Sequence, residues 1–443
     1  ANAAGGKGNV MLHFGYSKEG SVYSKDRSGL AIDNINNADL TGEIKDVFGL
    51  TTPFLSSFAP QGRVFYRIDN PAFDPGQPES ATNARTIARN RTFDRDGNII
   101  PFNTNGAGGA TPTGFNRQEF RTIAIPTSRY TFAGKGEFDL AANHRGYLEG
   151  TYVTTKTNAR LEPFPLDSAD SGSGLYPARG PGNNGRGPAE FNVNGTIVAN
   201  PLIPAGLLAE FTDTNGDGLR DYSFTRRLSE VGNRGSGAQT DTFRIASGVK
   251  GTLFNWDYDV YGIYGSNRRS QSSGGQYNVN SFRQAMEAIP DADDVDGDGD
   301  VTEAICRDAE ARAQGCVPAN VFGFDSLSPQ AVAWITAPAT LRTQVTQRVV
   351  GATASGEPLK LWAGPLGVAG GVEYRKESSL SEPDALYQRG LNGSNAIPIT
   401  QGSFSVKEAF LEGKLPLLKD APFAQSLAVS GAVRGSKYTT VGS

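Results

Sequence analysis

Two loops of this chain carry acidic residues at the spacing of a calcium-binding loop. In such a loop, oxygens from alternate positions converge on a hard cation, and a glycine at the sixth position permits the turn. The first loop offers these oxygens from the side chains of Asp213, Asn215, Asp217 and Asp221, and from the backbone carbonyl of Leu219. Phe224 occupies the twelfth position, where a bidentate Glu is expected. The sequence therefore predicts a weak calcium site, with an acidic, solvated loop as the alternative.

The second loop follows the same pattern and departs from it at the same place. Its candidate ligands are Asp294, Asp296, Asp298, Asp300 and Thr302. Gly299 provides the turn, and Ile305 occupies the twelfth position. Calcium in these loops is the only cofactor that the sequence suggests, and none is expected to be required.

The only two cysteines, Cys306 and Cys316, lie close together in the sequence. This spacing predicts a local disulfide, which forms in an oxidising compartment. Two free thiols are the alternative. A zinc site is not expected, because His13 and His144 lie far from both cysteines and no C-x-x-C pair is present.

Patterns typical of covalent or phosphate chemistry are not found in the sequence. Four glycines between Gly364 and Gly371 precede neither a helix start nor a GK[ST] sequence, so they are interpreted as strand glycines. Ser17 fails the last position of the nucleophile-elbow pattern. The two histidines are expected in a strand and a turn rather than in a catalytic dyad. We therefore do not expect an enzyme.

The composition excludes two classes of protein. The 443 residues are 37% hydrophobic and 20% charged, with a net charge of -4. They contain no basic block, so nucleic acid is not expected as a partner. No apolar run approaches the roughly 18 residues of a membrane helix, which excludes a helical membrane protein. Residues 1–9 lack the pattern of a signal peptide.

Alternation of apolar and polar residues predicts nine β-strands. Successive side chains of a strand point to opposite faces, so alternation gives one apolar and one polar face. In one run, Leu366, Val368, Val372 and Tyr374 alternate with Ala369, Gly371, Glu373 and Arg375. The nine strands are expected at 9–18, 121–140, 145–157, 240–251, 256–266, 341–354, 365–378, 404–416 and 426–438. Such strands can cross a bilayer, which takes about 9–11 tilted residues.

The connections between these strands alternate between short and long. The short ones are 140–144, 252–255, 356–364 and 416–425, and the long ones are near 19–120, 158–239, 267–340 and 379–403. Long loops on one side and short turns on the other are typical of a transmembrane β-barrel. We therefore predict an all-β, antiparallel barrel with long extracellular loops and short periplasmic turns. Residues 1–443 are expected to form one barrel segment without a separate plug domain, and its nine strands to be part of a larger barrel.

Side chains near the turns and on the polar faces have predicted roles. Aromatic residues near the short turns are expected to form an interfacial girdle, with cross-strand packing in a soluble sheet as the alternative; they are Phe138, Tyr147, Phe254, Trp256 and Tyr258. Charged residues on the polar faces are expected to line the lumen or hold a plug, with simple solvation as the alternative; they are Arg244, Lys250, Glu373, Arg375, Glu408, Glu412 and Arg434.

Two short helices are predicted in the third long loop. Residues 302–314 have helix-forming composition before Gly315, which is a typical stop. A second helix is expected to begin after Ser328, with Pro329 at its first position, and to run through Ile335.

Three segments resemble the barrel of TonB-dependent outer-membrane receptors. They are 364–375 (GPLGVAGGVEYR), 402–410 (GSFSVKEAF) and 431–442 (GAVRGSKYTTVG). Segment 316–323 (CVPANVFG), followed by Ser328 and Pro329, looks like a loop of the same family. The resemblance covers nearly the whole chain, without the family's N-terminal plug and energy-coupling box.

The resemblance implies part of a 22-stranded barrel in the outer membrane of a Gram-negative bacterium. It also implies contact with outer-membrane lipid, coupling to the TonB complex, and import of a scarce small ligand such as an iron chelate, a carbohydrate or a peptide. One alternative is a passive, structural or adhesive outer-membrane barrel, which a gene without plug and coupling box would favour. The other is a secreted calcium-binding β protein or enzyme, which solubility without detergent would favour.

Overall fold

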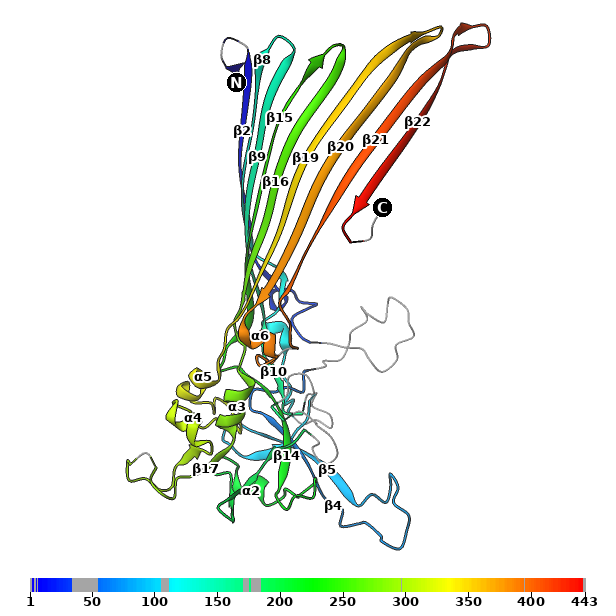
Figure 1. The fold of residues 1–443 in the computed structure, drawn as a ribbon. Helices are drawn as coiled ribbons and strands as arrows, with labels where there is room; N and C mark the ends of the chain where they lie inside the picture. The colour runs from blue at the N-terminus through cyan, green and yellow to red at the C-terminus, as the bar shows by residue number, and fades with distance from the viewer. Residues whose placement is uncertain are drawn as a thin grey trace.

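The computed structural model describes residues 2–3, 5, 7–33, 55–104, 111–169, 175–176, 185–295, 297–393 and 395–440. It has two parts: a long, curved main sheet and a compact head at one end of that sheet (Figure 1). The short turns of the sheet lie at the end away from the head. The separation of short turns from long excursions thus agrees with the alternation that the sequence predicts.

The main sheet has ten strands in the order β1-β2-β8-β9-β15-β16-β19-β20-β21-β22, and neighbouring strands are antiparallel. The strands are β1 (Asn2–Ala3), β2 (Gly8–Glu19), β8 (Thr127–Ala141), β9 (His144–Pro163), β15 (Asn233–Leu253), β16 (Trp256–Ser273), β19 (Ala339–Leu361), β20 (Gly364–Pro383), β21 (Thr400–Ala421) and β22 (Ala424–Tyr438). Each of the nine predicted segments overlaps one of the nine long strands. Several strands run farther toward the head than predicted, because pairing continues through polar residues that do not alternate with apolar ones.

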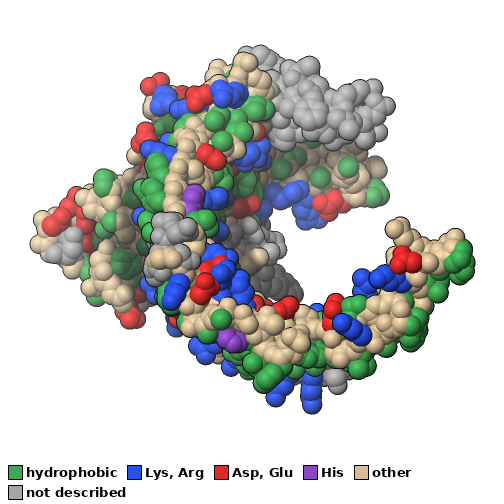
Figure 2. All heavy atoms as spheres, turned by 90° about the horizontal axis from the view of Figure 1, so that it is seen from above, with side chains coloured by type: hydrophobic (Ala, Val, Ile, Leu, Met, Phe, Trp, Pro, Cys, Tyr) green, Lys and Arg blue, Asp and Glu red, His purple; other side chains and the backbone are tan. Residues whose placement is uncertain are grey.

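The main sheet is open in the described residues. Its order begins with β1 and β2 and ends with β22, and these edges are not paired with each other. Seen from above, the sheet curves around a concave side that is not closed (Figure 2). The prediction of an all-β, antiparallel fold is confirmed, whereas closure into a barrel is not observed in this part of the chain.

Two-residue turns connect four pairs of neighbouring strands. They are residues 142–143, 254–255, 362–363 and 422–423. The predicted connections 356–364 and 416–425 were too long, because a bulge interrupts the alternation in β19 and in β21 before pairing resumes. Phe254 and Asn255 both have positive φ, at 51° and 63°, which a two-residue turn of type I′ requires.

The predicted strand 121–140 is divided in two. Its first residues form β7 (Thr122–Ala124), which pairs with β3 (Val22–Tyr23), and β8 begins only at Thr127. Pro126 stands between them and has no N–H for strand pairing. The proline therefore separates a strand of the head from a strand of the main sheet.

The long excursions fold together into the head. A six-stranded sheet has the order β10-β14-β4-β5-β6, and β11 pairs with β14. Its strands are β4 (Arg63–Asp69), β5 (Thr86–Phe93), β6 (Ile99–Pro101), β10 (Pro165–Asp167), β11 (Gly187–Pro188) and β14 (Asp221–Arg227). Two hairpins add β12 (Glu190–Val193) with β13 (Thr196–Ala199), and β17 (Ala288–Pro290) with β18 (Ala304–Cys306).

One hydrophobic core holds three of the long excursions together. Tyr66 comes from the first excursion, Leu207 and Tyr222 from the second, and Phe282 and Ile335 from the third, and all five are buried in a single cluster. The contacts join residues that are far apart in the sequence. The head is therefore one packed unit rather than a set of independent loops.

All helices of the described chain are short. They are α2 (Ala205–Leu208), α3 (Val279–Met286), α4 (Ala309–Ala313), α5 (Pro329–Ile335), α6 (Ala385–Arg389) and the 3₁₀ turns η2 (Ser24–Asp26) and η4 (Arg117–Glu119). The second predicted helix is confirmed as α5, with Ser328 capping it. The first prediction was wrong in its N-terminal half, because 304–306 pair as β18 and Asp308 caps α4. No helix in the described ranges is long and apolar enough to cross a membrane.

The predicted disulfide between Cys306 and Cys316 is confirmed. It joins the end of β18 to the segment after α4, so it encloses α4 in a loop with a sequence separation of 10 residues. Cys306 is buried at the β17–β18 hairpin.

Removing this disulfide should have a local effect. Because the closed loop is short, the Cys306→Ser/Cys316→Ser variant should lose about 2–3 kcal/mol of local stability. Hydrogen exchange should then speed up in residues 304–318 and stay unchanged in the main sheet. Unchanged exchange in 304–318 would contradict a stabilising role.

Candidate functional site

The two faces of the main sheet differ in chemical character. Figure 2 shows acidic and basic side chains gathered on the concave side, whereas hydrophobic side chains cover much of the convex side. The strand register explains this difference, since Glu373 and Glu408 are direct partners on one face while Val372 and Ala409 are partners on the other. Each face is described in turn.

An ion-pair network crosses β8, β9 and β15 on the concave face. The Lys135 ammonium lies 3.0 Å from a Glu149 oxygen and 3.3 Å from a Glu137 oxygen. The same Glu137 carboxylate accepts a 3.2 Å contact from Lys250, and Arg145 lies 3.6 Å from it. Opposite charges thus alternate between neighbouring strands, which is the favourable arrangement for cross-strand pairs.

Two tyrosines extend the network by lying across glycines. The Tyr147 hydroxyl passes Gly248 and donates to Asp259 at 3.1 Å. The Tyr261 hydroxyl passes Gly351 and donates to Glu373 at 2.8 Å. A Cβ atom on Gly351 would lie 2.5 Å from the Tyr261 ring, and one on Gly248 2.6 Å from the Tyr147 hydroxyl. Glycine is therefore required at both positions for the tyrosines to reach their carboxylates.

Filling the space under one ring should destabilise the sheet. Gly351→Ala should cost about 1–3 kcal/mol, because overpacking forces the Tyr261 ring away from Glu373. Gly413→Ala is the matched control, since a Cβ there meets nothing within 4 Å. Urea unfolding of both variants tests this. Equal midpoints for the two variants would contradict the close packing.

The network continues to the last strands of the sheet. Arg375 lies 3.3 Å from Glu373 and 3.2 Å from Glu377. Glu408 accepts a 2.5 Å hydrogen bond from Arg434 and a 2.9 Å hydrogen bond from Ser436. By register, the seven charged residues that the sequence predicted for this role share the concave face: Arg244, Lys250, Glu373, Arg375, Glu408, Glu412 and Arg434. Charged groups in such density require water or protein, rather than lipid, next to this face.

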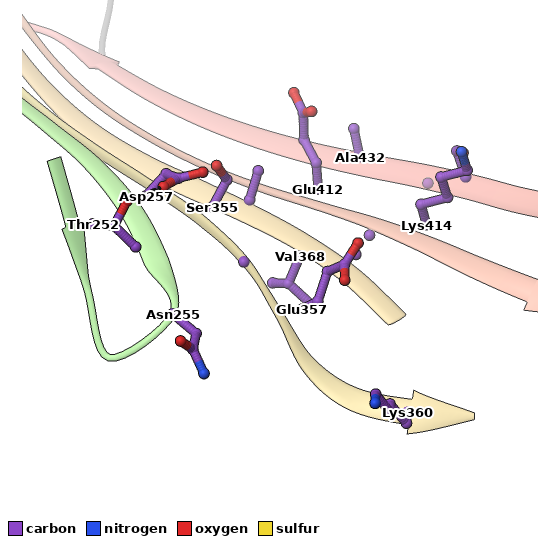
Figure 3. A pocket seen from close by; sticks show the side chains of 16 residues that line it. Thr252, Asn255, Asp257, Ser355, Glu357, Lys360, Val368, Glu412, Lys414 and Ala432 are labelled. Carbon is purple, nitrogen blue, oxygen red and sulfur yellow. Dashed lines mark hydrogen bonds between the residues drawn. The ribbon is translucent and has the colours of Figure 1, made fainter. Parts of the chain in front are cut away.

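A shallow hollow of about 1030 Å³ lies on the concave side near the short turns (Figure 3). One register row crosses it from β15 to β22 through Thr252, Asp257, Ser355, Ala369, Glu412 and Ala432. Small side chains fill the middle of this row, and a carboxylate stands on each side. The hollow is therefore open because its floor consists of small residues.

The histidines are separated by the sheet. His144 lies on the convex face, where its Nδ1 is 2.8 Å from the Tyr258 hydroxyl. His13 lies on the concave face, in register with Ala133. The two rings therefore lie on opposite faces. The predicted turn position of His144 was wrong, because this residue is the first of β9.

An aromatic belt crosses the convex face in the part nearer the head. Phe14 contacts Phe132 at 5.1 Å between ring centroids, Phe132 contacts Tyr152 at 6.4 Å, and Phe243 contacts Tyr264 at 6.3 Å. These residues come from five neighbouring strands. The prediction did not include this belt, although aromatics recur in the sequence about ten residues from each short turn.

A second set of aromatics is exposed at the short turns. Phe254, Trp362 and Phe423 are 88%, 75% and 83% exposed, and each lies in a different two-residue turn. Of the predicted girdle, Phe138 and Phe254 are exposed in this region. The prediction was wrong for Tyr147, which lies on the concave face. Trp256 packs over Gly356, and Tyr258 contacts His144.

The strip between the two sets of aromatics is apolar. Val372, Leu411 and Val433 are exposed on neighbouring strands. The convex residues of β20 from Leu366 to Tyr374 include no charged side chain. A large exposed apolar surface of this kind indicates contact with another apolar phase or protein.

The head contains a separate cavity of about 800 Å³. Its apolar wall includes Phe93, Phe115 and Phe324, and its polar groups include Asp94 and Arg95. The Arg95 guanidinium lies 4.6 Å from the centre of the Phe324 ring. An apolar wall with a few charged groups is typical of a site for a small molecule.

The first predicted calcium loop is closed by internal hydrogen bonds. Asp213 accepts from the N–H groups of Gly216 and Gly218 at 2.7 and 2.8 Å, and these bonds hold the pKa of its carboxyl below the ordinary value. Asp221 was predicted as the ninth ligand, but it is buried, and it pairs with Arg186 at 3.2 Å and Thr214 at 2.7 Å. Its carboxylate is therefore already occupied. Asn215, Asp217 and Leu219 remain in the exposed turn.

The second predicted calcium loop is not assembled into a metal site either. Asp294 accepts from the N–H of Gly299 at 3.0 Å, and Asp300 accepts from Thr302. Asp298 accepts from the N–H of Asp300, and Asp296 lies outside the described residues. Within the described part of the chain, no group of three or more His, Cys, Asp or Glu side chains is arranged for a metal ion. The structure thus gives the calcium prediction no support.

Comparison with known proteins gives a remote structural likeness. No family model and no curated protein matches the chain. Among solved structures, it is similar to the ferric-catecholate import receptor Fiu from E. coli K12 in its open form, at 10% identity and a TM-score of 0.20. The match covers 80% of this chain and 54% of that one, so this chain spans about half of that receptor's length. A likeness at this level carries no argument, and the assignment below depends on the geometry of the chain.

Proposed function

We propose that this chain forms part of the barrel wall and the outer head of a TonB-dependent receptor in a Gram-negative outer membrane. The observation that carries this proposal is the height of the apolar strip. On β20, ten residues separate Gly364 from Tyr374, which is about 33 Å of strand. A tilt of about 40° reduces this length to about 25 Å, which is the height of the apolar band of an outer-membrane barrel.

The aromatics at both borders of the strip support the same placement. Tyrosine and tryptophan side chains favour the interface between lipid and water. Trp362 and Phe423 would lie at the periplasmic interface, and Tyr264 and Tyr374 at the outer one. The head would then stand on the cell surface, and the concave face with its ion pairs would line the lumen.

The proposed activity is capture and import of a scarce ligand. The head offers a cavity with Phe115, Phe324 and Arg95 for a small molecule, such as an iron chelate, a carbohydrate or a peptide. The concave charges would contact a plug or the passing ligand, and the TonB complex would supply the energy for passage. The resemblance of segments 364–375, 402–410 and 431–442 to this family supports the coupling to TonB.

The complete protein tests this proposal in two steps. Membrane fractionation should recover it in the outer membrane, where an aqueous location would support a secreted β protein instead. A strain lacking the gene should then lose energy-dependent uptake of at least one ligand from the three classes, and loss of TonB should cause the same defect. Uptake that is independent of TonB would support a passive or structural barrel and overturn the receptor assignment.

A further inference from the structure

Four basic residues form a cluster on the convex face, next to the apolar strip. This convex basic patch consists of Arg348, Lys376, Lys407 and Lys437, one from each of β19, β20, β21 and β22. All four side chains are exposed. Arg348 is the direct register partner of Lys376, and Lys407 is the direct partner of Lys437. The patch therefore contains two like-charge pairs side by side.

Like charges at direct partner positions are unfavourable in an antiparallel sheet. Glu373 and Glu408 are also direct partners of like charge, but each has an arginine beside it, since Arg375 lies 3.3 Å from Glu373 and Arg434 donates to Glu408. In the described part of the chain, none of the four patch residues forms a salt bridge. A bound anion would relieve this repulsion and would supply the missing partner.

The patch begins where the apolar strip ends. Lys407 is the register partner of Tyr374, and Lys376 follows Tyr374 by two residues on the same face. From Tyr374 toward the turn, the convex residues of β20 are uncharged as far as Leu366. In the proposed membrane placement, the patch lies at the level of the lipid headgroups of the outer leaflet.

A polar hollow adjoins the patch on the side toward the head. It has a volume of about 530 Å³ and includes Arg348 in its lining. The other convex side chains around it are mainly hydroxyls, amides and one phenol: Tyr264, Gln344, Thr346, Ser378, Gln401 and Ser403. Thr346 and Ser378 are partners in the register, with their hydroxyls 2.6 Å apart. Hydroxyl and amide groups at such spacing can hydrogen-bond to a sugar.

We propose that the convex basic patch binds the phosphorylated headgroup of an anionic glycolipid. The lysines and Arg348 would pair with phosphate, the adjoining hollow would receive the sugar, and the apolar strip would contact the acyl chains. Arginine and lysine are both suited to phosphate, arginine through its planar fork of donors and lysine as a point charge. This inference rests on the membrane placement proposed above.

The test uses the complete protein in phosphatidylcholine vesicles. Lipid A, a diphosphorylated disaccharide lipid, should raise the unfolding temperature of the wild type in a saturable way. In Lys407→Gln/Lys437→Gln, apparent affinity should fall about 25-fold, because each basic residue beside an anionic lipid contributes about fivefold. Without lipid A, the same variant should be as stable as the wild type or more stable, because the like-charge pair is removed.

Lys18→Gln/Lys156→Gln is the matched control. It removes two exposed lysines from the same face, where Ser128 separates them in the register, so lipid A binding should be retained. An equal loss of lipid A affinity in both variants would indicate that general surface charge binds the lipid, and it would overturn the patch assignment. An equal temperature shift with phosphatidylglycerol, or with inorganic phosphate, would overturn the choice of a glycolipid.

The vesicle experiment also separates this inference from the proposed function. If the wild type inserts and unfolds cooperatively but shows no selective response to lipid A, only the patch assignment fails. If the wild type does not insert, the membrane placement fails, and the patch assignment fails with it.

Discussion

Arg226→Ala should destabilise the head by about 3–5 kcal/mol, which is the usual cost of breaking a buried ion pair by removing one partner. Arg226 is fully buried and forms an ion pair with Glu230. Its Nη1 donates to the Val321 carbonyl at 2.6 Å and to the Gly323 carbonyl at 2.9 Å. The variant leaves one carboxylate and two carbonyls without their donor in the interior.

Burial lowers the pKa of Arg226, while Glu230 opposes this shift. The guanidinium therefore remains buried at a desolvation cost, and its three contacts offset that cost only together. Thermal unfolding and hydrogen exchange of the head measure the loss. Arg67→Ala is the control, because the Arg67 side chain is exposed and, within the described residues, donates hydrogen bonds to Thr86 alone, so its effect should stay within about 0.5 kcal/mol. Equal effects of the two variants would contradict the assigned role of Arg226.

The next residue, Arg227, acts in the same way on another excursion. Its guanidinium donates to the Pro163 carbonyl and to the Ser56 hydroxyl, both at 2.9 Å, and burial lowers its pKa to about 10. Arg226 thus binds the third excursion to β14, and Arg227 binds the first. Two consecutive residues of one strand fix three excursions in one arrangement. A head assembled in this way can present a preformed cavity to a ligand, with little ordering cost on binding.

The strands and their faces could be predicted because they depend on local alternation. Val372 and Glu373 already differ in the sequence, and the register only brings each to its neighbours. The head could not be predicted, because Tyr66, Tyr222 and Phe282 meet through contacts across more than one excursion. Residues 304–306 show the same limit on a smaller scale, since pairing with β17 overrides their helix-forming composition.

For the candidate sites too, properties of single residues could be predicted, whereas contacts between residues distant in the sequence could not. The concave charges were predicted one by one, and register alone joins them into a network. Asp221 was misassigned, because its partner Arg186 is distant in sequence and cannot be inferred from loop spacing. The convex basic patch was missed for a related reason. Lys376 and Lys407 look like ordinary surface lysines until four strands place them together at the end of the apolar strip.

Val368→Arg tests the membrane placement at the position where the cost should be greatest. Val368 lies four residues from Gly364 and six from Tyr374, near the middle of the apolar strip. An arginine on the lipid face near the bilayer midplane should cost about 2–4 kcal/mol. Urea unfolding of the complete protein in vesicles measures this loss, and a nitroxide label at the same position should report lipid.

Ala369→Arg is the matched control for that substitution. Ala369 is the next residue of the same strand but faces the concave hollow, between Ser355 and Glu412 in the register. An arginine there can remain in water and approach the Glu412 carboxylate, so the loss should be below about 1 kcal/mol. A large difference between these adjacent positions is expected only if one face contacts lipid and the other does not. Equal losses, or a label at 368 that reports water, would overturn the membrane placement.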